Sequence, residues 1–104
     1  VLNLDAVPLM EGAEETAKAG ILSSLQPQNV RLRRAVVNLE EAGKNARYPL
    51  IFDPQTAGGL LASLPSENAD ACVNKLKELG YSRTTIIGEV VEKSENLEPI
   101  TVQI

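Results

Sequence analysis

A strand–helix–strand pattern in the second half of the chain constrains its fold most. The apolar run 60–64 ends at Pro65 and is typical of a buried strand. Apolar residues at helical spacing predict a helix over 66–79, which Gly80 closes as a left-handed cap. Residues 86–92 predict the next strand. Two strands joined by a helix form a helix-on-sheet layer, and the crossover is right-handed if the strands are parallel.

The predicted helix 66–79 is amphipathic. Ser66 is a favourable N-cap because its hydroxyl can accept from a free backbone N–H of the first turn. The apolar face is expected to pack on strands 60–64 and 86–92, and it consists of Ala69, Cys72, Val73, Leu76 and Leu79.

The first part of the chain predicts three further segments. Alternating residues predict a strand over 1–7, which Pro8 ends. A helical pattern follows over 9–19 and is closed by Gly20. The stretch 21–29 is rich in turn residues and predicts a loop.

Residues 30–42 fit two structures. Their apolar spacing favours a helix, whereas the β-branched pair 36–37 also suits an edge strand. Residues 49–53 are predicted to be extended, because Pro54 disfavours helical geometry in the residue before it. Alternation over 99–104 predicts the last strand.

These segments predict an α/β (α+β) fold, a two-layer sandwich. We expect a mixed sheet of about four strands with helices on one face. The chain has 104 residues, the size of one domain, so residues 1–104 are taken as a single unit. Aromatic residues make up only 3%, so the core must be aliphatic.

Charge and apolar content argue against two classes of partner. The net charge is −4, and an acidic domain repels a phosphate backbone, so nucleic acid is not expected. No apolar run approaches the roughly 20 residues that span a bilayer, so no membrane partner is expected either. Cys72 is the single cysteine, so no intrachain disulfide can form, and a cytoplasmic location is predicted.

The residue inventory excludes several catalytic sites. The sequence has no histidine and one cysteine, so it cannot build a Ser–His–Asp or Cys–His arrangement or a cysteine–histidine zinc site. Neither glycine-rich nucleotide fingerprint is present. We therefore assign no catalytic residue and no metal ligand to this chain.

The loop from Asp53 to Gly59 is the one unusual local feature. Its two adjacent glycines allow close approach of the backbone or positive φ, and its N–H groups could face an anion. A purely structural turn fits the same residues. The candidate binding residues are Asp53, Gln55, Thr56, Gly58 and Gly59.

Residues 50–65 closely resemble the Asp-Pro-Gln-Thr-(Ser/Ala)-Gly-Gly-Leu-Leu signature of the selenophosphate synthetases (selenide, water dikinases). Three further stretches, 4–9, 20–29 and 86–90, are similar to the family in order and spacing. The resemblance therefore covers nearly the whole chain, and residues 50–65 carry its most specific part.

The resemblance implies a parent enzyme that makes selenophosphate from selenide, ATP and water, with magnesium. In its superfamily, that of aminoimidazole ribonucleotide synthetase, an N-terminal domain dimerises and holds ATP. A C-terminal α/β domain packs behind it, and this chain resembles that domain. In the superfamily a short helix can precede the double glycine, which conflicts with an extended segment 49–53.

The family's reactive cysteine or selenocysteine, lysine and metal-binding aspartates lie upstream of the stretches matched here. The chain is therefore expected to be a non-catalytic fragment without cofactors of its own, lacking the first elements of its domain. Its expected partner is the missing N-terminal domain of the same polypeptide, within a parent homodimer. In that parent the loop 53–59 would close one wall of the active site.

Two other interpretations remain open. The chain fits a free-standing α/β binding or interaction module that has reused this fold. It also fits another member of the same ATP-dependent superfamily, although Gln55 and Thr56 beside the double glycine favour the selenophosphate synthetases.

Overall fold

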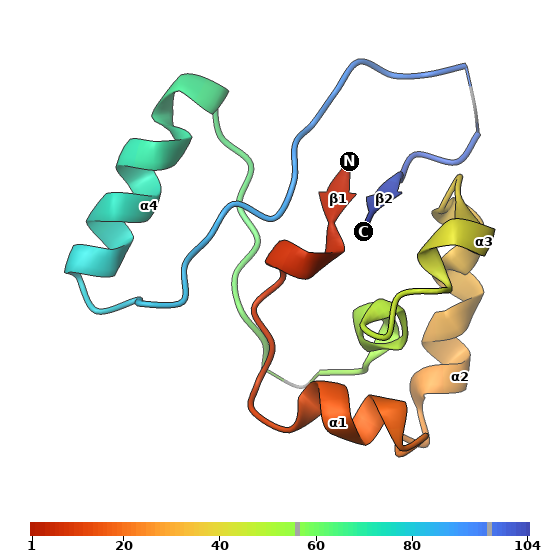
Figure 1. The fold of residues 1–104 in the computed structure, drawn as a ribbon. Helices are drawn as coiled ribbons and strands as arrows, with labels where there is room; N and C mark the ends of the chain where they lie inside the picture. The colour runs from red at the N-terminus through yellow and green to blue at the C-terminus, as the bar shows by residue number, and fades with distance from the viewer. Residues whose placement is uncertain (56, 96) are drawn as a thin grey trace.

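The computed structural model describes residues 1–55, 57–95 and 97–104. It consists of a small body, residues 1–52 and 98–104, and an arm, residues 60–86, that extends away from it (Figure 1). The elements are β1 (Leu2–Asn3), a 3-10 helix (Leu4–Ala6), α1 (Ala13–Lys18), α2 (Gln26–Asn29), a 3-10 helix (Val30–Ala35), α3 (Leu39–Ala42), 3-10 helices (Tyr48–Phe52 and Ser66–Asn68), α4 (Ala69–Glu78) and β2 (Val102–Gln103).

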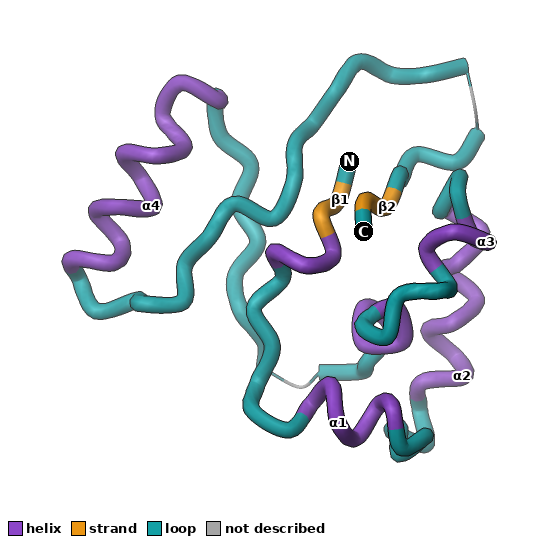
Figure 2. Tube along the Cα trace, viewed as in Figure 1, coloured by secondary structure: helices purple, strands orange, loops and turns teal. Residues whose placement is uncertain are grey.

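Strand β1 lies between two extended segments that are distant in sequence (Figure 2). On one side it pairs in parallel with β2, with Leu2 opposite Val102, and Leu2 N donates to Thr101 O at 2.8 Å. On the other side Leu2 forms an antiparallel bridge with Gly88. The parallel pairing therefore joins the two ends of the chain, and the bridge adds residue 88 to the same short strand.

Gly88 allows this close approach of two backbones. A Cβ at this position would clash with the carbonyl oxygen of Val1 and would lie 3.2 Å from the Cα of Leu2. Both obstacles are backbone atoms, so neither can move without opening the bridge.

The core lies under β2. Leu4 and Val102 are 1% and 2% exposed, and Val36 and Ala42 are buried beside them. Val36 reaches this position because it bridges Ile100 in parallel, with Val37 N donating to Ile100 O at 2.8 Å. This cluster is aliphatic, as the composition predicts, but Phe52 is also buried and Tyr48 packs against the cluster.

Asn38 completes the hydrogen bonding of β2 from its second side. Its Nδ2 donates to Val102 O at 2.7 Å, and its Oδ1 accepts from Val102 N at 3.0 Å. A side-chain amide thus takes the place of a neighbouring strand, and the buried Val102 keeps both backbone groups paired.

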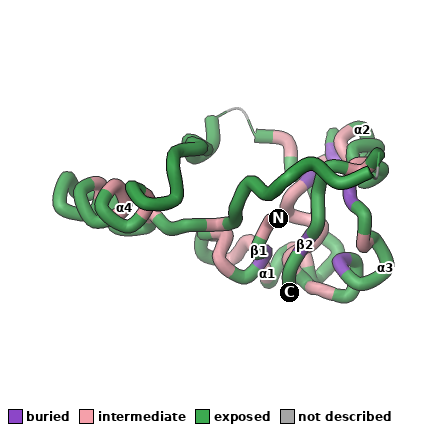
Figure 3. The backbone as a smooth tube through the Cα atoms, turned by 90° about the horizontal axis from the view of Figure 1, so that it is seen from above, coloured by how far each residue is buried: buried purple, intermediate pink, exposed green. Residues whose placement is uncertain are grey.

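The predicted helix 66–79 is confirmed as a 3-10 turn followed by α4, and Gly80 has the expected left-handed φ of +99°. Its predicted packing is wrong in this chain. No residue of α4 is buried, and the helix lies apart from the body (Figure 3). Segment 60–64 is not a strand, and Leu60 is fully exposed, because no sheet lies beside it to receive its apolar side chains.

The mixed α/β character is confirmed, but the expected sheet of about four strands is not. Among the described residues the sheet has two strands, and segment 86–92 contributes only the bridge at Gly88 and the hydrogen bonds of residues 87 and 89 on either side of it. The predicted strands at both ends of the chain shrink to the two residues of β1 and of β2.

Three further predictions are corrected or refined. The loop predicted over 21–29 contains α2, and the extended segment predicted over 49–53 is a 3-10 helix, as the family resemblance allowed. Residues 30–42 combine both alternatives, since helical turns flank the bridge at Val36. In the described ranges, no helix is both long and apolar enough to cross a membrane.

We predict that Gly88→Ala lowers the free energy of unfolding by about 1–3 kcal/mol, the usual cost of forcing an extra methyl group into packed structure. Urea denaturation measures the change. Gly59→Ala is the matched control, because a Cβ there meets nothing within 4 Å. Equal stability of the two variants would mean that the bridge at Gly88 does not hold the fold together.

Candidate functional site

The candidate loop, residues 53–59, begins where the 3-10 helix Tyr48–Phe52 ends. Asp53 N donates to Leu50 O at 3.1 Å, and Asp53 itself is extended, with φ −64° and ψ 124°. Pro54 explains this change of backbone direction, since the residue before a proline avoids helical geometry. The predicted extended conformation of Asp53 is therefore confirmed.

Two side-chain amides of α2 fix the start of the loop. Gln26 Nε2 donates to Pro49 O at 2.6 Å, and Asn29 Nδ2 donates to Phe52 O at 3.1 Å. Gln26 and Phe52 are both buried, at 3% and 6% exposure. Sequence reasoning missed this anchor because it took 21–29 as a loop. The signal was the spacing of Gln26 and Asn29, one helical turn apart.

The described loop residues Asp53, Gln55, Gly58 and Gly59 are all exposed, and Thr56 lies outside the described residues. The side chain of Gln55 folds back over Gly58, so that its Oε1 occupies the space that a Cβ on Gly58 would need. Neither Gly58 nor Gly59 has positive φ. The double glycine therefore leaves room above the backbone and does not form a left-handed turn.

This arrangement can present an amide side chain and backbone N–H groups to an anion. Within residues 1–55, 57–95 and 97–104 there is no group of three or more acidic, histidine or cysteine side chains that could hold a metal ion. The assignment of the loop as a binding site stays a prediction.

An apolar pocket of about 440 Å³ lies behind the anchor of the loop. It is lined by Leu22 and Ser23, by residues of α2 and by residues of the two 3-10 helices beside it, and by none of the described residues in 53–59. Gln26 Oε1 and Tyr48 Oη are buried there without a partner among the described residues. Because both atoms are sealed from solvent, a ligand in the pocket would not reach them.

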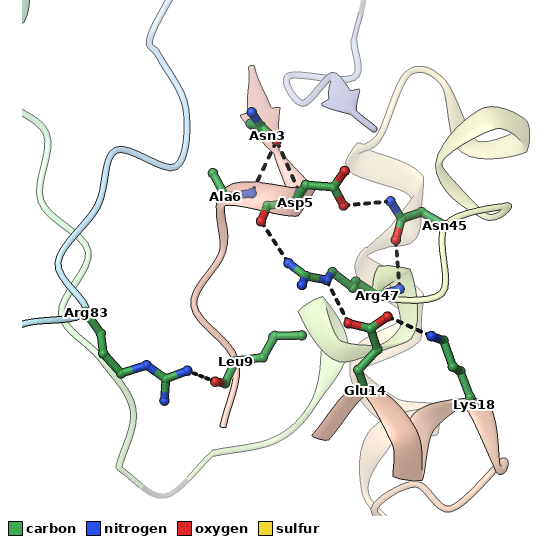
Figure 4. A network of polar contacts seen from close by, with 9 residues as sticks. All are labelled: Asn3, Asp5, Ala6, Leu9, Glu14, Lys18, Asn45, Arg47 and Arg83. Atoms are coloured by element: carbon green, nitrogen blue, oxygen red, sulfur yellow. Dashed lines mark hydrogen bonds and ion pairs between the residues drawn. The ribbon is translucent and has the colours of Figure 1, made fainter. Parts of the chain in front are cut away.

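A second polar cluster ties α1 to the body (Figure 4). Arg47 donates from Nε to Glu14 Oε2 at 3.0 Å and from a terminal nitrogen to Asp5 O at 2.8 Å. Lys18 Nζ lies 2.8 Å from Glu14 Oε1. Hydrogen bonds from Lys18 and Arg47 hold the pKa of the Glu14 carboxyl below its ordinary value of 4.5. The cluster is structural, since its charges are paired with one another.

Comparison with curated proteins finds relatives that are selenide, water dikinases. The chain is 36% identical over 89 residues to selenide, water dikinase 2 of Peptoclostridium acidaminophilum, covering 86% of the chain and 25% of that protein. It is 37% identical to selenide, water dikinase of Clostridioides difficile strain 630, covering 86% of the chain and 26% of that protein.

The corresponding protein of Pelobacter propionicus is 36% identical over 97 residues, which cover 93% of this chain and 27% of the relative. The chain thus spans about a quarter of the length of the relatives it matches, as expected of a partial C-terminal domain. No family model matches the chain, and no solved structure matches it.

We predict that Glu14→Gln lowers the urea midpoint at neutral pH and that the difference disappears on acidification. A carboxyl with a lowered folded-state pKa stabilises the fold above its unfolded-state pKa, and this contribution is lost as pH falls through the folded-state value. Urea titrations from about pH 7 to about pH 3 measure the effect. Glu15→Gln, at an exposed neighbour in α1, is the control. The same pH profile for both variants would contradict the role of the ion pairs.

Proposed function

The chain matches about a quarter of the length of the selenide, water dikinases compared with it. We propose that it is a C-terminal segment of a selenophosphate synthetase. Such a parent enzyme makes selenophosphate from selenide, ATP and water and acts in the cytoplasm. The observation that carries the proposal is the sequence identity to three relatives of the same name, together with the double-glycine signature at residues 53–59.

The segment itself is not catalytic in this proposal. Its sequence has no histidine, and its one cysteine, Cys72, is half-buried on α4, far along the chain from the loop. The described side chains offer no cluster for Mg²⁺. ATP and magnesium are therefore assigned to the remaining three-quarters of the parent.

The loop 53–59 is proposed to close one wall of the parent's active site. The support is its construction, with a start fixed by Gln26 and Asn29 and an exposed amide at Gln55. An anchored loop positions its N–H groups reproducibly, which is what recognition of a charged group needs.

The partner proposed for the exposed arm is the rest of the same polypeptide, in a homodimeric parent. The arm and the segment after it expose large apolar side chains that a soluble monomer would normally cover. The most exposed of them are Leu60, Leu61, Leu79, Val90 and Leu97.

We predict selenide-dependent formation of AMP and selenophosphate by the full-length protein and none by residues 1–104 alone. The reason is that the family's reactive cysteine or selenocysteine, lysine and metal-binding aspartates lie upstream of the stretches matched here, and the described residues hold no group of metal-ligating side chains. The assay measures AMP and ³¹P signals with and without selenide. Turnover by the segment above a protein-free blank would refute the proposal that the segment is not catalytic. An inactive full-length protein would refute the proposed function of the parent.

We further predict that Gln55→Ala and Thr56→Ala each reduce selenophosphate formation by the full-length enzyme about ten-fold to a hundred-fold. A lost hydrogen bond to a charged group costs about 1.5–3 kcal/mol. Gln28→Ala, at an exposed glutamine of α2, is the matched control.

The melting temperature of residues 1–104 should not change in any of these variants, because Gln28 and the described candidate residues of the loop are exposed. If the activity of Gln55→Ala and Thr56→Ala stays within about two-fold of the unmodified enzyme, the loop is a structural turn and not a binding site. Lost activity with an equal loss of stability would do the same.

A further inference from the structure

The antiparallel ladder on β1 continues to the first residue of the chain. Val1 and Glu89 exchange both hydrogen bonds: the Val1 amine donates to Glu89 O at 2.8 Å, and Glu89 N donates to Val1 O at 3.0 Å. Leu2 lies opposite Gly88, and Asn3 N donates to Ile87 O at 2.8 Å. This register places any residue joined to Val1 opposite Val90, and the residue before that opposite Val91.

The positions opposite that extension are open. Val90 is 86% exposed and Val91 is 54% exposed. Nowhere in the described ranges do the backbone groups of these two residues have a hydrogen-bond partner. They follow directly on a paired segment, so their backbone is already aligned with the ladder.

We propose that the polypeptide directly preceding Val1 in the full-length protein is an extended strand that continues β1 and pairs antiparallel with Val90 and Val91. The inference rests on the proposed function, in which this chain is one part of a protein about four times as long. Main-chain hydrogen bonds of this kind tolerate many sequences, so the register can be specified without knowing the residues.

The occupant is this covalent continuation and not a second copy of the chain. Val1 is already paired, so the next two residues are held at the edge at high effective concentration. A second copy would have to bring a free strand and lose its freedom of motion on binding.

The alternation of an antiparallel ladder makes the register testable at single residues. Because Val1 and Glu89 exchange both bonds, the adjacent pair at Val90 exchanges none, and the next pair at Val91 exchanges both. The amide hydrogen of Val91 should therefore become protected, whereas that of Val90 should not.

The test adds the tripeptide Lys-Thr-Val before Val1 and measures hydrogen exchange by NMR. We expect exchange of the Val91 amide to slow by about ten-fold relative to residues 1–104, with no change at Val90. The matched control is Lys-Pro-Val, in which the proline two residues before Val1 has no N–H to donate to Val91 O. Because the proline carbonyl can still accept from the Val91 amide, this control should show weaker added protection than Lys-Thr-Val.

The amide of Glu89 is the internal reference, since it is bonded to Val1 O in every variant. Equal exchange of Val91 in all three proteins, or protection of Val90 in its place, would overturn the proposal. Protection that rises with protein concentration, with dimers in sedimentation, would assign the edge to a second copy and overturn it as well. The measurement needs no selenide chemistry, so its failure is separate from failure of the proposed function.

Discussion

The hydrogen-bond ladder around Leu2 is the interaction on which the rest of the body depends. It joins the first three residues to 87–89 on one side and to 101–103 on the other. These contacts are the most distant in the sequence, so they cost the most chain entropy and must form for the core to exist. Leu4 and Val102, the two most deeply buried large side chains, lie directly beside this ladder.

The arm shows what happens where no such ladder forms. Helix α4 has the apolar spacing of an amphipathic helix and a left-handed Gly80 after it, although no side chain caps its first turn. Its apolar face stays half-exposed because no strand lies beneath it. A hydrogen bond from Arg83, in the arm after α4, to Leu9 O links the arm to the first part of the chain (Figure 4). Local signals thus form the helix, but packing depends on partners that this chain does not bring to it.

The sequence predicted features that depend on neighbouring residues and failed where distant pairing decides. Helix 66–79, the left-handed Gly80 and the extended Asp53 follow from local preferences and are confirmed. The strand at 60–64 was inferred from an apolar run that ends at Pro65, and such a run cannot supply a hydrogen-bonding neighbour. Segment 86–92 finds one only over residues 87–89. At the candidate site the loop was found from its motif, whereas its anchor on α2 was not, because side-chain bonds across 23 residues leave only a weak trace in spacing.

The two ends of the candidate loop therefore differ in how firmly they are held. Its start is bonded to α2 through buried groups, whereas the chain after Gly59 runs into the exposed arm. Its second end has no such anchor among the described residues, so order there depends on whatever covers the arm. Covering the arm and positioning the loop are thus coupled: the same packing that buries Leu60 and Leu61 would set the geometry of the double glycine. A binding site built in this way is complete only when the surrounding fold is complete.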